Sequence, residues 1–89
     1  MSQVFYRGFP SHERTVFSVV CRRYGFIADD FDVSAIEGVG AGAERTPRIV
    51  TVELKTTRTS MQYAGDAGNF WPAEFEHDLS SDIFGPAPD

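Results

Sequence analysis

Residues 69–85 constrain the fold most, because they carry a complete helix signature. Phe75, Leu79 and Ile83 recur at every fourth position and therefore stack along one side of a helix. Pro72 suits the first helical turn, where a missing backbone N–H costs no hydrogen bond, and a glycine-proline pair marks the end. The sequence therefore predicts a terminal helix whose apolar side closes the core of the protein.

An earlier helix is predicted from His12 to Tyr24, with Ser11 as its N-cap and Gly25 as its stop. Its many β-branched residues have low helix propensity, so this helix depends on tertiary packing. The predicted buried side consists of Val16, Phe17, Val20, Cys21 and Tyr24.

Alternating apolar and polar residues predict strands between the two helices. Residues 31–35 and residues 48–56 both alternate, and their inward positions are Phe31, Val33, Ala35, Val50, Val52 and Leu54. In residues 57–63, Met61 and Tyr63 fall out of phase with the preceding strand. Either a tight turn at 57–58 starts a third strand or a bulge shifts one long strand. We prefer the turn.

The predicted fold is a small α+β domain with the order (β)-α-β-β-β-α. It contains a three-stranded antiparallel meander with two helices packed on one face. Residues 1–10 are expected to be an edge strand or an ordered arm, residues 1–85 a single domain, and residues 86–89 a mobile tail.

The order α-β-β-β-α resembles that of the double-stranded-RNA-binding domain. Such domains present a basic helix N-terminus to phosphate. Here the last helix starts with Glu74 and Glu76, so the resemblance extends to element order alone.

Composition narrows the function classes. The net charge of −5 opposes general attraction to nucleic acids and anionic membranes. The single cysteine, Cys21, allows no internal disulfide and is interpreted as a core residue. The N-terminus lacks the pattern of a secretory signal and no apolar run reaches the length of a membrane span, so a cytoplasmic location is expected.

Three candidate chemistries are weak in this sequence. The glycine-rich residues 38–43 match G-x-G-x-x-A, but a strand rather than a helix follows, so no cofactor is expected. Asp29, Asp30 and Asp32 lack the remaining ligands of a calcium loop, so no metal is expected. His77 lies near acidic and serine residues on an outward helix face, which offers no cavity for catalysis. A non-enzymatic protein is therefore the expectation.

The outer side of the terminal helix is the predicted partner-binding surface. It combines Glu74, His77, Asp78 and Asp82, and the chain contains no Lys or Arg after Arg58. A one-signed acidic surface suits a small inhibitor or regulator, of the phage or mobile-element type, that occupies a basic groove on a protein partner. The aromatic excess, the aromatic N-terminal arm (Phe5, Tyr6 and Phe9) and the exposed strand edges of a small sheet also suggest a homodimer.

The alternative function is nucleic-acid binding through the first helix. Arg14, Arg22 and Arg23 could contact phosphates there. The overall negative charge makes direct nucleic-acid binding the second choice.

Overall fold

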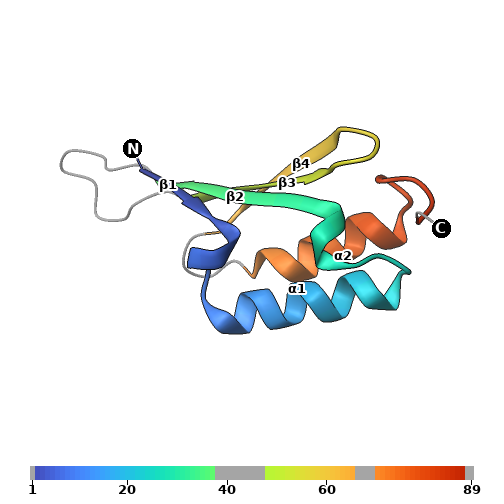
Figure 1. Ribbon diagram of the computed structural model, residues 1–89, viewed down its shortest axis with the longest axis horizontal. Helices are drawn as coiled ribbons and strands as arrows, with labels where there is room; N and C mark the ends of the chain where they lie inside the picture. The colour runs from blue at the N-terminus through green and yellow to red at the C-terminus, as the bar shows by residue number, and fades with distance from the viewer. Residues whose placement is uncertain (1, 38–47, 66–69, 88–89) are drawn as a thin grey trace.

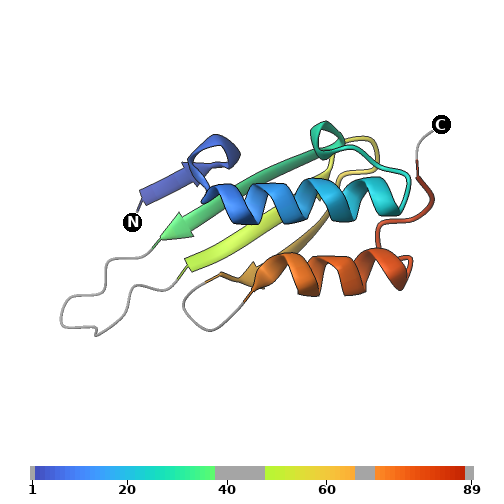
Figure 2. The same cartoon turned by 90° about the horizontal axis from the view of Figure 1, so that it is seen from below.

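The computed structural model describes residues 2–37, 48–65 and 70–87. Four antiparallel strands form one sheet in the order β1-β2-β3-β4, and two helices cover one face of it (Figures 1 and 2). The predicted α+β class with both helices on one face is confirmed. The elements are β1 (Ser2–Phe5), α1 (Ser11–Arg23), β2 (Phe31–Glu37), β3 (Arg48–Leu54), β4 (Thr59–Ala64) and α2 (Trp71–Ser80), with 3-10 turns η1 (Tyr6–Gly8) and η2 (Ala28–Asp30).

The sheet has four strands rather than the three predicted, because the N-terminal arm pairs with β2. In this pairing Val4 lies opposite Ala35, and Phe5 lies opposite Ser34. The order α-β-β-β-α of the double-stranded-RNA-binding domain does not include β1, so the resemblance in element order covers only the elements from α1 to α2. The arm is therefore an edge strand followed by the short turn η1, and its Phe9 is buried in the core.

The preferred turn between β3 and β4 is confirmed. Arg58 has a left-handed backbone with φ of 63°, and its N–H donates to the Leu54 carbonyl at 2.8 Å. This turn places Tyr63 opposite Val50 and Met61 opposite Val52. The shift in alternation thus reflects a reversal of chain direction.

The core lies between the sheet and the helices and is rich in aromatic residues. α1 begins one residue earlier than predicted, with Pro10 at the N-cap position, and Ser11 is its first helical residue. The predicted N-cap is therefore wrong. The largest fully buried side chains are Trp71, Phe17, Phe75, Phe84, Leu54, Val50, Val52, Pro72 and Cys21.

The terminal helix is shorter than predicted, and this changes which residue closes the core. α2 ends at Ser80, and Asp82 then adopts a left-handed conformation with φ of 65°. Because the chain turns there, the four-residue spacing no longer applies. Ile83 is 44% exposed, whereas Phe84 is 2% exposed and packs among core aromatics. The prediction of Phe75 and Leu79 as core is confirmed, and that of Ile83 is wrong.

The glycine-rich segment 38–43, which was weighed as a cofactor loop, lies outside the described residues. Within the predicted tail, Ala87 is half-buried and packs against the core.

Candidate functional site

The outer side of α2 and the edge strand β4 form the two walls of an open groove. Glu74, His77 and Asp78 are spaced at i, i+3 and i+4, so the helix presents all three on one side. The structure therefore brings together three of the four predicted partner-binding residues. The residues lining the groove are Gln62, Tyr63, Ala73, Glu74, His77 and Asp78.

A hydrogen bond joins the two walls of the groove. The Tyr63 hydroxyl donates to Asp78 Oδ2 at 2.7 Å, and the Tyr63 ring is buried against the core. Burial, this hydrogen bond and the negative charges of Asp78 and Glu74 raise the pKa of Tyr63 well above its usual range. Tyr63 thus remains a neutral donor that fixes the Asp78 carboxylate against β4.

Glu74 and His77 are exposed, and neither side chain forms a hydrogen bond or ion pair with another described residue. Glu76 differs, because it faces α1 and forms an ion pair with Arg23. The acidic residues of α2 therefore divide into one neutralised by its neighbour helix and a pair, Glu74 and Asp78, that faces the groove.

Asp82 lies beyond the end of α2, outside the groove. Its N–H donates to the Leu79 carbonyl at 3.2 Å, and the N–H of the next residue donates to the Asp78 carbonyl at 3.1 Å. These bonds end the helix through a left-handed residue, a position that favours glycine or asparagine. The structure thus gives Asp82 a role in helix termination, apart from the groove.

The three arginines of the alternative nucleic-acid surface differ in their contacts and exposure. Arg14 is half-buried, and its Nε donates to the Phe9 carbonyl at 3.1 Å. Arg23 faces α2 and pairs with Glu76. Arg22 is exposed and shares a shallow hollow with Arg14. The structure therefore separates Arg23 from the other two.

Glu13 anchors a buried polar network that the sequence analysis missed. The Glu13 carboxylate accepts from Arg48 Nη1 at 3.0 Å, from Arg48 Nη2 at 2.9 Å and from Trp71 Nε1 at 2.9 Å. Arg48 also donates to the Gly65 carbonyl at 3.0 Å and lies over the Phe9 ring, 4.7 Å from its centroid. The network joins the starts of α1, β3 and α2.

The environment of Glu13 favours its charged form. Burial alone would raise the pKa of Glu13, which is only 7% exposed, but hydrogen bonds from Arg48 and Trp71 and the charge of Arg48 lower it overall. The signal in the sequence was the spacing, since Glu13 lies four residues before the buried Phe17 on the same helix side.

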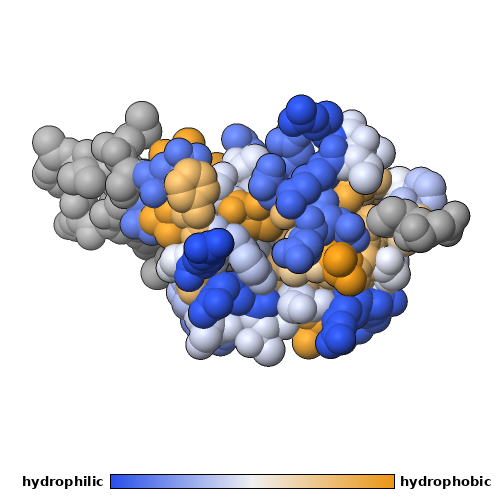
Figure 3. Space-filling model, viewed as in Figure 1, coloured by the Kyte–Doolittle hydropathy of each residue, from blue (hydrophilic) through white to orange (hydrophobic). Residues whose placement is uncertain are grey.

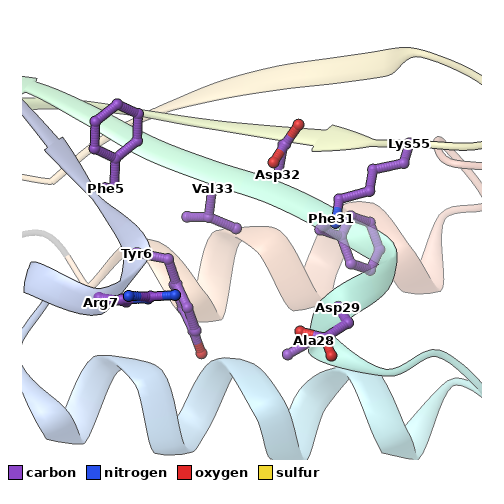
Figure 4. A pocket seen from close by; sticks show the side chains of 9 residues that line it. All are labelled: Phe5, Tyr6, Arg7, Ala28, Asp29, Phe31, Asp32, Val33 and Lys55. Atoms are coloured by element: carbon purple, nitrogen blue, oxygen red, sulfur yellow. The ribbon is translucent and has the colours of Figure 1, made fainter.

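Another hollow lies at the edge of the sheet opposite β4, between the end of β1 and η2 (Figure 4). Figure 3 shows hydrophobic residues exposed among hydrophilic ones on this side of the molecule. The hollow carries both signs of charge, from Arg7 and Lys55 and from Asp29 and Asp32, so it favours no single charge on a ligand. In Figure 4, Val33 points toward the helix layer and Asp32 points away from it.

Nucleophilic chemistry at Cys21 is opposed by its surroundings. Burial, with a smaller contribution from the charge of Asp30, raises the pKa of Cys21 to about 12, and the side chain is fully buried.

Across residues 2–37, 48–65 and 70–87, no three His, Cys, Asp or Glu side chains are grouped as metal ligands. Neither of the helices described here has the length and apolar character needed to cross a membrane.

Comparison of the chain with protein families, with curated proteins and with solved structures found no match.

Proposed function

We propose that the protein is a non-enzymatic protein-binding module that acts as a small acidic inhibitor or regulator. It engages a basic surface of its partner through the acidic groove formed by α2 and β4. The observation that carries this proposal is the position of Glu74 and Asp78 on one wall of an open groove, with no cation among the described lining residues.

The electrostatics support a basic partner. Glu74 is exposed, so its charge is available to a ligand, while Tyr63 holds the Asp78 carboxylate in a fixed position. Complementary charges across an interface raise the association rate and select partners of the opposite sign. A partner surface rich in Lys or Arg, such as a groove that otherwise holds nucleic acid, meets this requirement.

The proposal is tested by capturing partners from a lysate of the organism that encodes the chain. Glu74→Lys should abolish capture, and wild-type capture should weaken steeply as salt is raised. Asp32→Lys is the matched control, because it makes the same change in net charge at an exposed residue of the open sheet face. Unchanged capture by the Glu74 variant, with unchanged salt dependence, contradicts the proposal.

Nucleic-acid binding is the second function to test, because Arg14 and Arg22 share one hollow of α1. A gel-shift titration with mixed DNA and RNA at low salt separates the two functions. A shift at micromolar protein that is lost in Arg22→Glu favours nucleic acid, since non-specific binders reach that range.

A further inference from the structure

β4 has a free edge, because one side of this strand pairs with no other described strand. β4 pairs with β3 on its other side, over all six of its residues. The Gly65 N–H donates to the Arg48 carbonyl at 2.8 Å, one position beyond the pair formed by Ile49 and Ala64. Since backbone groups alternate in direction along an antiparallel strand, the N–H and C=O groups of Ser60, Gln62 and Ala64 point away from β3.

This edge lacks the features that usually block strand addition. Proteins protect sheet edges with charged residues, proline, bulges, very short strands or a covering helix or loop. β4 reads Thr59-Ser60-Met61-Gln62-Tyr63-Ala64, without a charged residue, a proline or a glycine. It is also longer than the opposite edge strand β1, which has four residues and continues directly into η1. Because Ser60, Gln62 and Ala64 are also exposed, this edge is open to another extended chain as far as the described residues are concerned.

The neighbouring helix determines the charge of that chain. Glu74, His77 and Asp78 stand beside β4 in the same groove as Gln62 and Tyr63. Side chains of an added strand alternate between the two sheet faces, so every second one would lie on the side of α2. Basic side chains at those positions would meet Glu74 and Asp78.

The same charges disfavour a second copy of the chain at this edge. If two β4 strands paired edge to edge, both α2 helices would lie on one side of the joined sheet. The acidic residues of the two copies would then face each other across the junction, and like charges in such positions repel. Charge complementarity thus selects a basic partner over a homodimer.

We propose that β4 is a strand-addition site for an extended basic segment of the partner. The backbone of Ser60, Gln62 and Ala64 supplies the hydrogen bonds, and Glu74 and Asp78 select Lys or Arg at alternate positions of the segment. This inference rests on the proposed function and specifies how the partner is bound.

The test uses the full chain and a capped synthetic peptide of alternating lysine and valine. Amide hydrogen exchange followed by NMR should show slowing at Ser60, Gln62 and Ala64 by at least about tenfold at saturating peptide. A control peptide with the same sequence, N-methylated at every residue, should not cause this protection, because neither of its edges retains the N–H donors needed for a ladder.

A pair of variants tests the backbone directly. Gln62→Pro removes an N–H that points away from β3 and forms no ladder bond with it. Proline is tolerated at such edge positions. It should weaken peptide binding about fivefold to tenfold, as expected for one hydrogen bond. Gln62→Ala keeps the N–H and should bind within about twofold of the wild type. The exchange experiment on the wild type remains decisive if the proline variant fails to fold.

Each outcome decides between the two proposals. Equal binding of both peptides without protection of β4 overturns strand addition and leaves an acidic docking surface intact. Protection that persists unchanged in Glu74→Lys supports the backbone pairing of β4 with the peptide, but it contradicts both the selection of basic side chains by Glu74 and the acidic-surface function. Absence of peptide binding at millimolar concentration overturns strand addition, as does protection that grows with protein concentration in the absence of peptide.

Discussion

Glu13 and Glu74 carry the same side chain on the two helices but lie in opposite environments. Glu13 is buried and accepts three hydrogen bonds from Arg48 and Trp71. Glu74 is exposed beside a groove, with no partner in the described part of the chain. The hydrogen-bond donors around Glu13 hold its charge within the fold, whereas the charge of Glu74 stays exposed, where the proposed partner could reach it.

The largest expected effect is on removing the buried carboxylate. Glu13→Ala leaves the largely buried Arg48 guanidinium without its counter-ion, so the free energy of unfolding should fall by about 3–5 kcal/mol. Urea denaturation followed by the fluorescence of Trp71 measures this change. A loss as small as that in Glu74→Ala would break the comparison between the two glutamates.

The next effect is the response to acid. The pKa of Glu13 is lowered in the folded state, so its contribution to stability is present above the unfolded pKa of about 4.3 and is lost as the pH falls through the folded pKa. Urea denaturation of the wild type and of Glu13→Gln should give stabilities that differ most near neutral pH and converge in acid. A difference that stays constant with pH would show that the charge of Glu13 is not what stabilises the fold.

A smaller effect is expected at Tyr63, whose buried ring and hydroxyl connect the core to Asp78, a residue of the proposed binding groove. Tyr63→Phe removes the hydrogen bond to Asp78 and should lower the free energy of unfolding by about 1 kcal/mol. It should also weaken partner capture less than Glu74→Lys does, because the Asp78 carboxylate remains in the groove. Thermal denaturation and capture assays measure the two effects separately, and a loss of stability above about 3 kcal/mol would contradict this assignment.

Asp82 was predicted as a binding residue, but the structure gives it a left-handed backbone with φ of 65°. Asp82→Gly should therefore raise the free energy of unfolding by about 0.5–1 kcal/mol, since glycine adopts this conformation without steric cost. Partner capture should not change. Thermal denaturation tests the first expectation, and weaker capture by this variant would return Asp82 to the binding surface.

The smallest effect on stability is expected at Glu74. Glu74→Gln keeps the size of the side chain and removes its charge, so the free energy of unfolding should change by less than about 0.5 kcal/mol while partner capture falls. Denaturation and capture assays on one preparation give both numbers. A large loss of stability with unchanged capture would reverse the roles assigned to the two glutamates.

Much of the fold followed from local patterns. The spacing of Phe75 and Leu79 and the alternation of residues 48–56 depend on the periodicity of single elements, and the structure confirms both. Ile83 was placed wrongly because a single left-handed residue at Asp82 shifts the inward position to Phe84. Periodicity carries no warning of such a turn.

The features missed by the sequence analysis depend on contacts between distant segments. Glu13 has the spacing of a core residue, but a charged side chain predicts an exposed position. Its burial is explained only by the hydrogen bonds from Arg48 and Trp71, which are distant in the sequence. The groove likewise needs β4 beside α2, so the proximity of Gln62 to Glu74 and His77 could not be predicted from either element alone. An edge strand was one of the two alternatives predicted for residues 1–10, but its pairing with β2 is a third contact between distant segments that the local pattern could not indicate.

The network around Glu13 also bears on the order of folding. Its ion pair joins residues 35 positions apart and its indole hydrogen bond joins residues 58 positions apart. Contacts of such long range require most of the loop-closure entropy to be lost first, so we expect them to form after the pairing of β2 with β3 and of β3 with β4. Interactions that are absent from the transition state slow unfolding without accelerating folding. We therefore expect the buried glutamate to lengthen the lifetime of the native state by slowing its unfolding, with little effect on the rate of folding.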